Sequence, residues 1–323
     1  MRSIIQLALV LSISLIFSCG GDAPSSTSQT ESTQASDTTE VTTPADANDA
    51  TTRASHDCTV EGKILDGNQT WLNKQELLVT ILADDSTNDP DYGEGHRVLV
   101  ITDTKTCEEV QRETLPVSSS PDFPYYIAEI VYNNTSQLVG IRGADVIYCY
   151  DVVQRALLSP LSPSFLSERL TDDAQSGMIQ RLEVWENYLI GYAQDMGTFV
   201  FDLSDKGTPK ALLPYAEFKT PTGDFHSMFM VPSSEDGLQA IVPQYDYDAD
   251  EFKVNPLFQA GKSLNTNIPK SAKNNRFLVL REKGEAGKAV GIDLLNCKEI
   301  ELPEDTAQKK VQEVLSWLRA NAG

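Results

Sequence analysis

Two acidic segments have the residue types and spacing that could bind a hard cation. Residues 84–96, DDSTNDPDYGEGH, contain five carboxylates, and residues 245–251, YDYDADE, carry aspartates at alternate positions. Ca²⁺ binds about six to eight oxygen ligands, so clusters of carboxylates are chemically suited to it. The candidate metal ligands are Asp84, Asp85, Asp89, Asp91, Glu94, Asp246, Asp248 and Asp250.

A simpler interpretation of both segments is a solvated hairpin tip. The second segment departs from the EF-hand pattern, since Glu251 stands where that loop requires Gly and Leu257 stands where its bidentate Glu belongs. We therefore predict no cofactor, with Ca²⁺ as the alternative. The tyrosines of these segments could equally belong to a binding rim; they are Tyr92, Tyr245 and Tyr247.

The sequence offers little that is typical of an enzyme. Its three histidines, His56, His96 and His226, are far apart, and no GxSxG, HExxH, P-loop or GxGxxG motif is present. A metal site or a catalytic triad would have to be assembled from distant positions. The sequence therefore favours a protein without catalytic activity and leaves an enzyme as an alternative.

The first 18 residues are typical of a signal peptide. Arg2 precedes an apolar run from Ile4 to Phe17, which is too short to span a bilayer permanently. The residues LIFSC, ending at Cys19, resemble a bacterial lipobox. The resemblance implies that Cys19 is lipidated, each buried methylene adding about 0.8 kcal/mol of membrane affinity. Gly20, in place of Asp, implies the outer membrane, with the periplasmic or surface face left open. An ordinary secretory signal is the alternative.

Residues 19–56 are predicted to be a disordered tether that follows the lipidated cysteine. Ser, Thr, Ala, Asp, Glu, Gln and Pro dominate this segment, and Val41 is its only large aliphatic residue after Asp22. Such a composition buries too little apolar surface to offset the entropy of ordering. A glycosylated stalk or a partner-binding segment is the alternative.

Net charge narrows the possible partners, and the cysteine content narrows the possible disulfides. The net charge of −21 argues against nucleic acid, because a duplex-binding protein needs a basic surface. Four cysteines follow Cys19, and in an exported chain they permit two disulfides in three pairings. We favour a bridge among Cys58, Cys107 and Cys297, whereas Cys149 lies in an apolar run that suits a buried thiol.

A repeat runs through residues 57–303, which we predict to be one all-β domain. Short runs rich in Val, Ile, Tyr and Phe alternate with Gly, Asn, Asp and Pro, as in strands joined by turns. Strand-ending aspartates recur at separations of 48, 51, 44 and 47 residues. We expect each to accept backbone N–H groups at a strand-to-turn corner. They are Asp103, Asp151, Asp202, Asp246 and Asp293.

The repeat units resemble those of known propeller families. The segment GTFVFDLSDKGTPKALLP, residues 197–214, is similar to an LVIVD repeat, and VLVITDTKTCEEV, residues 98–110, is similar to YVTN and WD-type repeats. The resemblance implies a β-propeller of about five imperfect blades, or six if the insert from Pro160 to Gln180 contains a degenerate sheet. We expect the strand from Cys58 to Leu65 to complete the last blade and so close the ring.

Residues 304–323 are predicted to form a C-terminal amphipathic helix. Val311, Val314, Leu315 and Leu318 recur at helical spacing, and Asp305 or Thr306 could cap the start. We expect the apolar face to dock on the propeller, with a partner-binding helix as the alternative.

These features together predict a function. The leading hypothesis is an envelope lipoprotein, held to the membrane by its N-terminal lipid, whose propeller binds or scaffolds another envelope or surface protein. One alternative is a hydrolase or lactonase-like enzyme with a divalent cation in the channel. A second alternative is a calcium-dependent adhesin or sensor.

Overall fold

The computed structural model describes residues 58–170, 177–205, 208–233, 237–246, 248–260, 276–282 and 287–322. These ranges all belong to one compact unit, Asp46–Gly323. The predicted signal peptide, Cys19 and the predicted tether lie outside the described residues.

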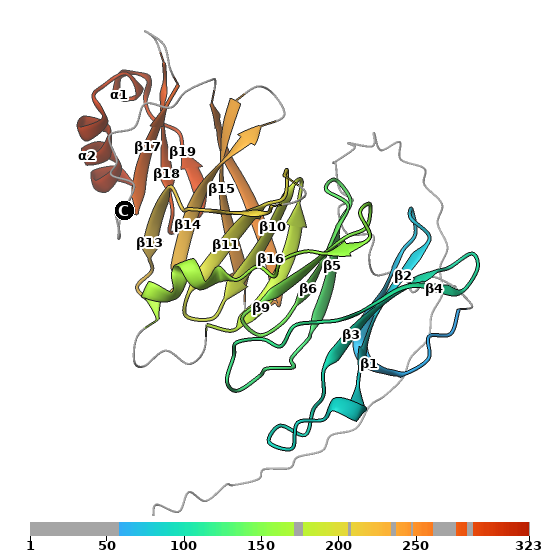
Figure 1. The fold of residues 1–323 in the computed structure, drawn as a ribbon. Helices are drawn as coiled ribbons and strands as arrows, with labels where there is room; N and C mark the ends of the chain where they lie inside the picture. Colours follow the sequence, from blue (N-terminus) through green and yellow to red (C-terminus); the bar gives the residue numbers. More distant parts are fainter. Residues whose placement is uncertain are drawn as a thin grey trace, which may run out of the picture. The chain divides into compact units, whose positions relative to one another are not determined.

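The described residues form five antiparallel sheets whose strands follow one another along the chain (Figure 1). The first sheet contains β1 (Lys63–Leu72), β2 (Leu77–Ala83), β3 (Arg97–Asp103) and β4 (Glu108–Thr114), and the second contains β5 (Glu129–Asn133), β6 (Leu138–Arg142), β7 (Ile147–Asp151) and β8 (Ala156–Leu157). The third contains β9 (Ile179–Trp185), β10 (Tyr188–Ala193), β11 (Gly197–Asp202) and β12 (Lys210–Leu212). The fourth contains β13 (Ala216–Lys219), β14 (Phe225–Ser233), β15 (Gly237–Asp246) and β16 (Glu251–Ala260), and the fifth contains β17 (Phe277–Arg281), β18 (Ala289–Asp293) and β19 (Lys298–Ile300).

Helices are few in the same ranges. They are the 3₁₀ helices η1 (Asp85–Thr87) and η2 (Pro163–Arg169) and the α-helices α1 (Glu304–Ala307) and α2 (Val311–Asn321). None of those described is long and apolar enough to cross a membrane. The insert at 160–180 holds η2 and the start of β9 in its described part, rather than a sheet of its own. The prediction of an all-β fold with five propeller-type blades and a C-terminal amphipathic helix is confirmed.

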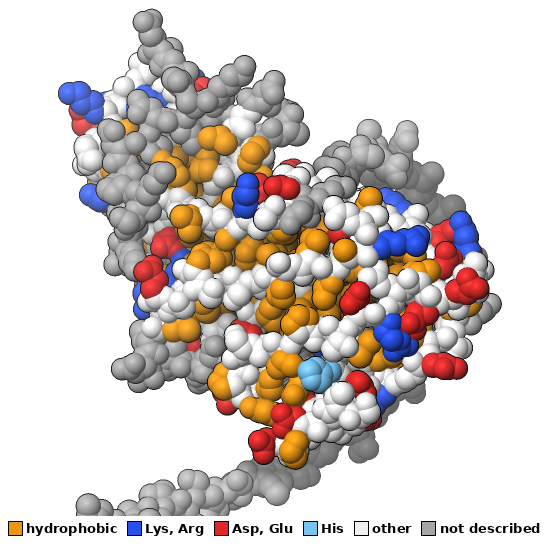
Figure 2. Space-filling model, viewed as in Figure 1, with side chains coloured by type: hydrophobic (Ala, Val, Ile, Leu, Met, Phe, Trp, Pro, Cys, Tyr) orange, Lys and Arg blue, Asp and Glu red, His pale blue; other side chains and the backbone are white. Residues whose placement is uncertain are grey.

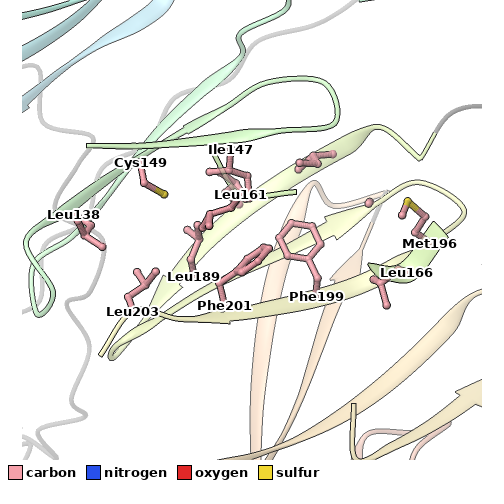
Figure 3. Packing of buried hydrophobic residues seen from close by; sticks show 13 residues of the cluster. Leu138, Ile147, Cys149, Leu161, Leu166, Leu189, Met196, Phe199, Phe201 and Leu203 are labelled. Carbon is pink, nitrogen blue, oxygen red and sulfur yellow. The ribbon is translucent and has the colours of Figure 1, made fainter. Parts of the chain in front are cut away.

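Each pair of successive sheets shares a hydrophobic cluster, and these clusters form most of the core. Successive side chains of a strand point to opposite faces of its sheet. A strand is therefore buried on both faces when its sheet lies between two other sheets. Figure 3 shows the cluster between the second and third sheets, where Ile147 and Cys149 of β7 face Leu189 of β10 and Phe199 and Phe201 of β11. No sheet buries its apolar residues alone.

The N-terminal segment lies on the first sheet, contrary to our prediction. Val60 packs against Leu82, Val98 and Val100, and a disulfide joins Cys58 to Cys107 in the β3–β4 turn. Residues from Lys63 onward form β1, which pairs with β2. The prediction that the strand Cys58–Leu65 completes the last blade is therefore wrong. The disulfide and the apolar outer face of the first sheet hold this segment at the start of the array.

The last sheet is covered by the C-terminal helix. Val314, Leu315 and Leu318 of α2 form a cluster with Phe277, Val279 and Ala289 of β17 and β18. Figure 1 shows α1 and α2 beside these strands. The predicted apolar positions of the helix are buried at Val314, Leu315 and Leu318, whereas Val311 is partly buried. The helix covers a face that a further sheet would otherwise cover.

The repeated aspartates have the structural role that the sequence indicates. In each of the five, one side-chain oxygen accepts the backbone N–H of the residue two positions on, at 2.8–3.1 Å. In four of them the residue four positions on has positive φ; these residues are Cys107, Arg155, Asp250 and Cys297. The carboxylate thus fixes a tight turn at the end of the strand. The repeat is a folding signal rather than a site of chemistry.

Candidate functional site

The strongest candidate site is a group of aromatic side chains on two loops of the first and second sheets. We call it the aromatic rim, and it consists of Tyr92, His96, Phe123, Tyr125 and Tyr126. Tyr125 meets Tyr92 and His96 edge to face, with ring centroids 6.1 Å and 5.6 Å apart, and Phe123 meets Tyr126 at 6.4 Å. Tyr92 and Phe123 remain 44% and 45% exposed. Large aromatic rings held partly in solvent are typical of protein-binding surfaces.

The first rim loop, residues 84–96, is a structured hairpin between β2 and β3. The Asp84 carboxylate accepts the backbone N–H of Ser86 at 3.1 Å and caps η1. The backbones of Asp89 and Glu94 pair in an isolated antiparallel β-bridge. Gly95 is required here, because a Cβ atom at this position would lie 2.1 Å from the backbone oxygen of Asp84. The loop therefore holds Tyr92 and His96 in defined positions.

The second rim loop, residues 116–128, connects β4 with β5 and is held by Asp145. The hydroxyls of Ser118 and Ser119 both donate to the Asp145 carboxylate. Tyr148 donates to the carbonyl of Pro116 at 2.6 Å, and burial raises the pKa of Tyr148 to about 12, so its phenol stays protonated. The two loops are joined to each other by the Tyr92 hydroxyl, which donates to the carbonyl of Pro121 at 2.7 Å.

The rim is acidic. Residues 84–96 and 116–128 contain six Asp or Glu and no Lys or Arg. Asp85 pairs with Lys63 at 3.1 Å and Glu94 pairs with Arg97 at 2.6 Å. On the face shown in Figure 2, acidic side chains lie beside hydrophobic ones close to a histidine. The negative charge of the two loops is thus only partly balanced by cations.

The surroundings shift the pKa values of two titrating groups at the rim. The hydroxyl and the N–H of Ser86 hold the pKa of Asp84 below its usual value, so this carboxylate is ionised at neutral pH. Desolvation, followed by the charge of Asp89, raises the pKa of Tyr125. The neutral Tyr125 phenol donates to Asp89 at 3.4 Å.

The predicted calcium ligands take part in turns and ion pairs. In the second acidic segment, Asp246 accepts the N–H groups of Asp248 and Ala249, and Asp250 accepts the Tyr245 hydroxyl at 2.7 Å. Across the described ranges, no group of three or more His, Cys, Asp or Glu side chains is arranged to hold a metal ion. The calcium site therefore stays a prediction, and no cluster of ligands in the described residues corresponds to it.

The other predicted rim tyrosines do not join the aromatic rim. Tyr245 packs against Tyr192 and Phe252, with centroids 5.4 Å and 6.3 Å apart, so it belongs to the contact between the third and fourth sheets. Tyr247 lies outside the described residues, as does His56. Among the predicted candidates, only the 84–96 segment reaches the site.

The cysteines and the remaining histidine form no nucleophilic site in the described structure. Cys297 and Cys149 are buried free thiols, and desolvation raises the pKa of each to about 12. His226 Nδ1 lies 2.8 Å from the carbonyl of Leu294 and 3.9 Å from the Cys297 sulfur. A carbonyl oxygen only accepts, so Nδ1 carries the proton and cannot act as a base toward the thiol. The disulfide uses Cys58 and Cys107, two of the three candidates.

Sequence reasoning missed the second rim loop. Phe123, Tyr125 and Tyr126 occur in the run PDFPYY, whose prolines interrupt the strand pattern between two repeat units. A loop with three aromatic residues in four positions is itself a signal of a binding surface.

No protein-family model matches the chain, and no curated protein matches it. Among solved structures, the dihydro-heme d1 dehydrogenase NirN superposes with a TM-score of 0.30 at 13% identity, over 71% of this chain and 44% of that chain. The Cps50 (Swd1) β-propeller domain of Myceliophteria thermophila gives 0.31 at 11% identity, over 72% and 69%.

A chain of a mitotic checkpoint complex gives a TM-score of 0.32 at 11% identity, over 82% of this chain and 74% of that chain. This chain spans less than half the length of the first of these structures.

Replacing Asp145 with Ala tests how the second rim loop is held. Because a hydrogen bond to a charged group contributes about 1.5–3 kcal/mol, we expect amides of residues 118–126 to exchange their hydrogens about tenfold to a hundredfold faster. Asp202→Ala, which removes a turn carboxylate from the third sheet, should leave this loop unchanged. Unaltered exchange in Asp145→Ala would show that the carboxylate does not hold the loop.

Proposed function

We propose that this protein is a lipid-anchored binding module of the bacterial envelope, and that its aromatic rim holds a partner protein without catalysing a reaction. The observation that carries the proposal is the pair of half-exposed rings, Tyr92 and Phe123, on two loops that hydrogen bonds fix to a rigid scaffold. Rings that are ordered before binding lose little entropy when a partner covers them.

The chemistry of the described residues supports binding rather than catalysis. The two free thiols are buried and protonated at neutral pH, and the histidine beside one of them donates to a carbonyl. The Asp145 carboxylate accepts two serine hydroxyls and has no histidine among its described partners. The Asp145 carboxylate thus holds a loop, and the Cys149 thiol packs in the hydrophobic core.

The membrane anchor is the second part of the proposal. The lipobox-like residues LIFSC and the polar segment 22–55 support it. Acyl chains on Cys19 would keep the module at the membrane, and the segment that follows would space the rim from the lipid surface.

Site-specific photo-crosslinking in the native envelope tests the rim. A benzophenone amino acid at position 123 or 92 should give discrete adducts with protein partners, because these rings would be covered in the complex. The same probe at Val153 or Leu213, which are 64% and 76% exposed outside the rim, is the control. Adducts of equal yield at all four positions, or none at 92 and 123, would count against the proposed binding surface.

Replacing Cys19 with Ser tests the anchor. We expect the variant to move from the membrane fraction to the soluble fraction, since it lacks the acceptor for lipid. Metabolic labelling with a fatty acid should mark the wild-type protein and not the variant. Retention of Cys19→Ser in membranes would contradict the lipoprotein proposal and would leave the rim proposal intact.

A further inference from the structure

We propose that the partner segment bound at the aromatic rim is basic, with Lys or Arg side chains placed over the rim rings and beside its carboxylates. This inference rests on the proposed binding function and specifies the chemistry of the partner. Its two independent supports are the exposed aromatic rings and the sign of the charge around them.

Exposed aromatic rings are able to bind a cation. Tyr92 and Phe123 are each more than two-fifths exposed, and Tyr125 is partly exposed between Tyr92 and His96. The face of an aromatic ring carries partial negative charge, so ammonium and guanidinium groups bind to it. Arg169 over Phe225, at 4.7 Å from the ring centroid, shows the same contact within this fold.

Most carboxylates of the two rim loops form no ion pair with a Lys or Arg of the described residues. Within the described residues, no Lys or Arg forms an ion pair with Asp84, Asp89, Asp91 or Asp122, whereas Asp85 and Glu94 each have one. Asp91 and Asp122 are exposed and lie one residue before Tyr92 and Phe123. Each exposed ring therefore has a carboxylate next to it in the chain.

This combination favours a basic protein segment over other occupants. An acidic surface repels the anionic headgroups of a membrane and an anionic polymer. A single small cation could contact one ring, but the rim presents two exposed rings on separate loops. A segment with alternating basic and apolar side chains would cover the rings and neutralise the adjacent carboxylates at the same time.

Peptide binding to the full-length mature protein in detergent tests the proposal. The probes are three fluorescent 12-residue peptides with the repeats KFRY, QFNY and EFDY, which share their aromatic residues and carry positive, zero and negative charge at the other positions. We expect the basic peptide to bind at least tenfold more tightly than the neutral one and to weaken as salt is raised, because salt screens exposed charges. The acidic peptide should bind most weakly.

Two variants with matched charge changes locate the effect. The double variant Asp91→Lys, Asp122→Lys should weaken binding of the basic peptide at least tenfold and should change binding of the neutral peptide by less than twofold. Glu299→Lys with Glu301→Lys makes the same change in net charge on exposed positions near the fifth sheet and should alter binding less than twofold. Phe123→Ala should weaken binding of both the basic and the neutral peptides.

Three results would overturn the inference. These are equal binding of the three peptides, binding of none of them, and equal losses in the two charge-reversed pairs. The photo-crosslinks at positions 92 and 123 separate this failure from a failure of the proposed function. If those adducts persist, the rim binds a partner that is not basic; if they are absent, the rim is not a binding surface.

Discussion

The sharing of apolar faces between successive small sheets is the interaction on which the rest of the structure depends. Each sheet has at most four described strands, and its inner positions are buried only because the next sheet covers them. Burying a Val, Leu or Ile side chain contributes about 1.5–3 kcal/mol, so an uncovered face would be costly. The two terminal faces need other covers, which are the disulfide-held segment at Val60 and the helix α2.

Local features of this arrangement could be read from the sequence. The strand-ending aspartates recur once per sheet, so their period predicted the number of sheets. This signal can be read from the sequence because each aspartate makes its turn with residues next to it in the chain. The spacing of Val314, Leu315 and Leu318 gave the buried face of α2 for the same reason. The position of the Cys58 segment could not be read in this way, since an apolar strand can pair with either end of the array.

The candidate site shows the same division between local and long-range information. Tyr92 lies in a segment whose acidic residues marked it as a hairpin tip. Pro121 and Tyr125 come about 30 residues later in the chain, and they contact Tyr92 only because β3 and β4 bring the second rim loop back beside the first. Contacts that depend on the register of two sheets leave no periodic signal in a single sequence. The rigid sheets thus bring together two loops that are separate in the sequence. The proposed binding surface depends on this placement.

Native-state hydrogen exchange of Leu318→Ala, compared with the exposed control Gln312→Ala, tests most directly whether α2 is needed to cover the last sheet. Leu318 is fully buried against the last sheet, and removing such a side chain costs about 2–5 kcal/mol. The account predicts that amides of β17 and β18 exchange about thirtyfold faster or more in Leu318→Ala, while those of β2 and β3 keep their protection. Unchanged exchange in β17 and β18 would contradict the account.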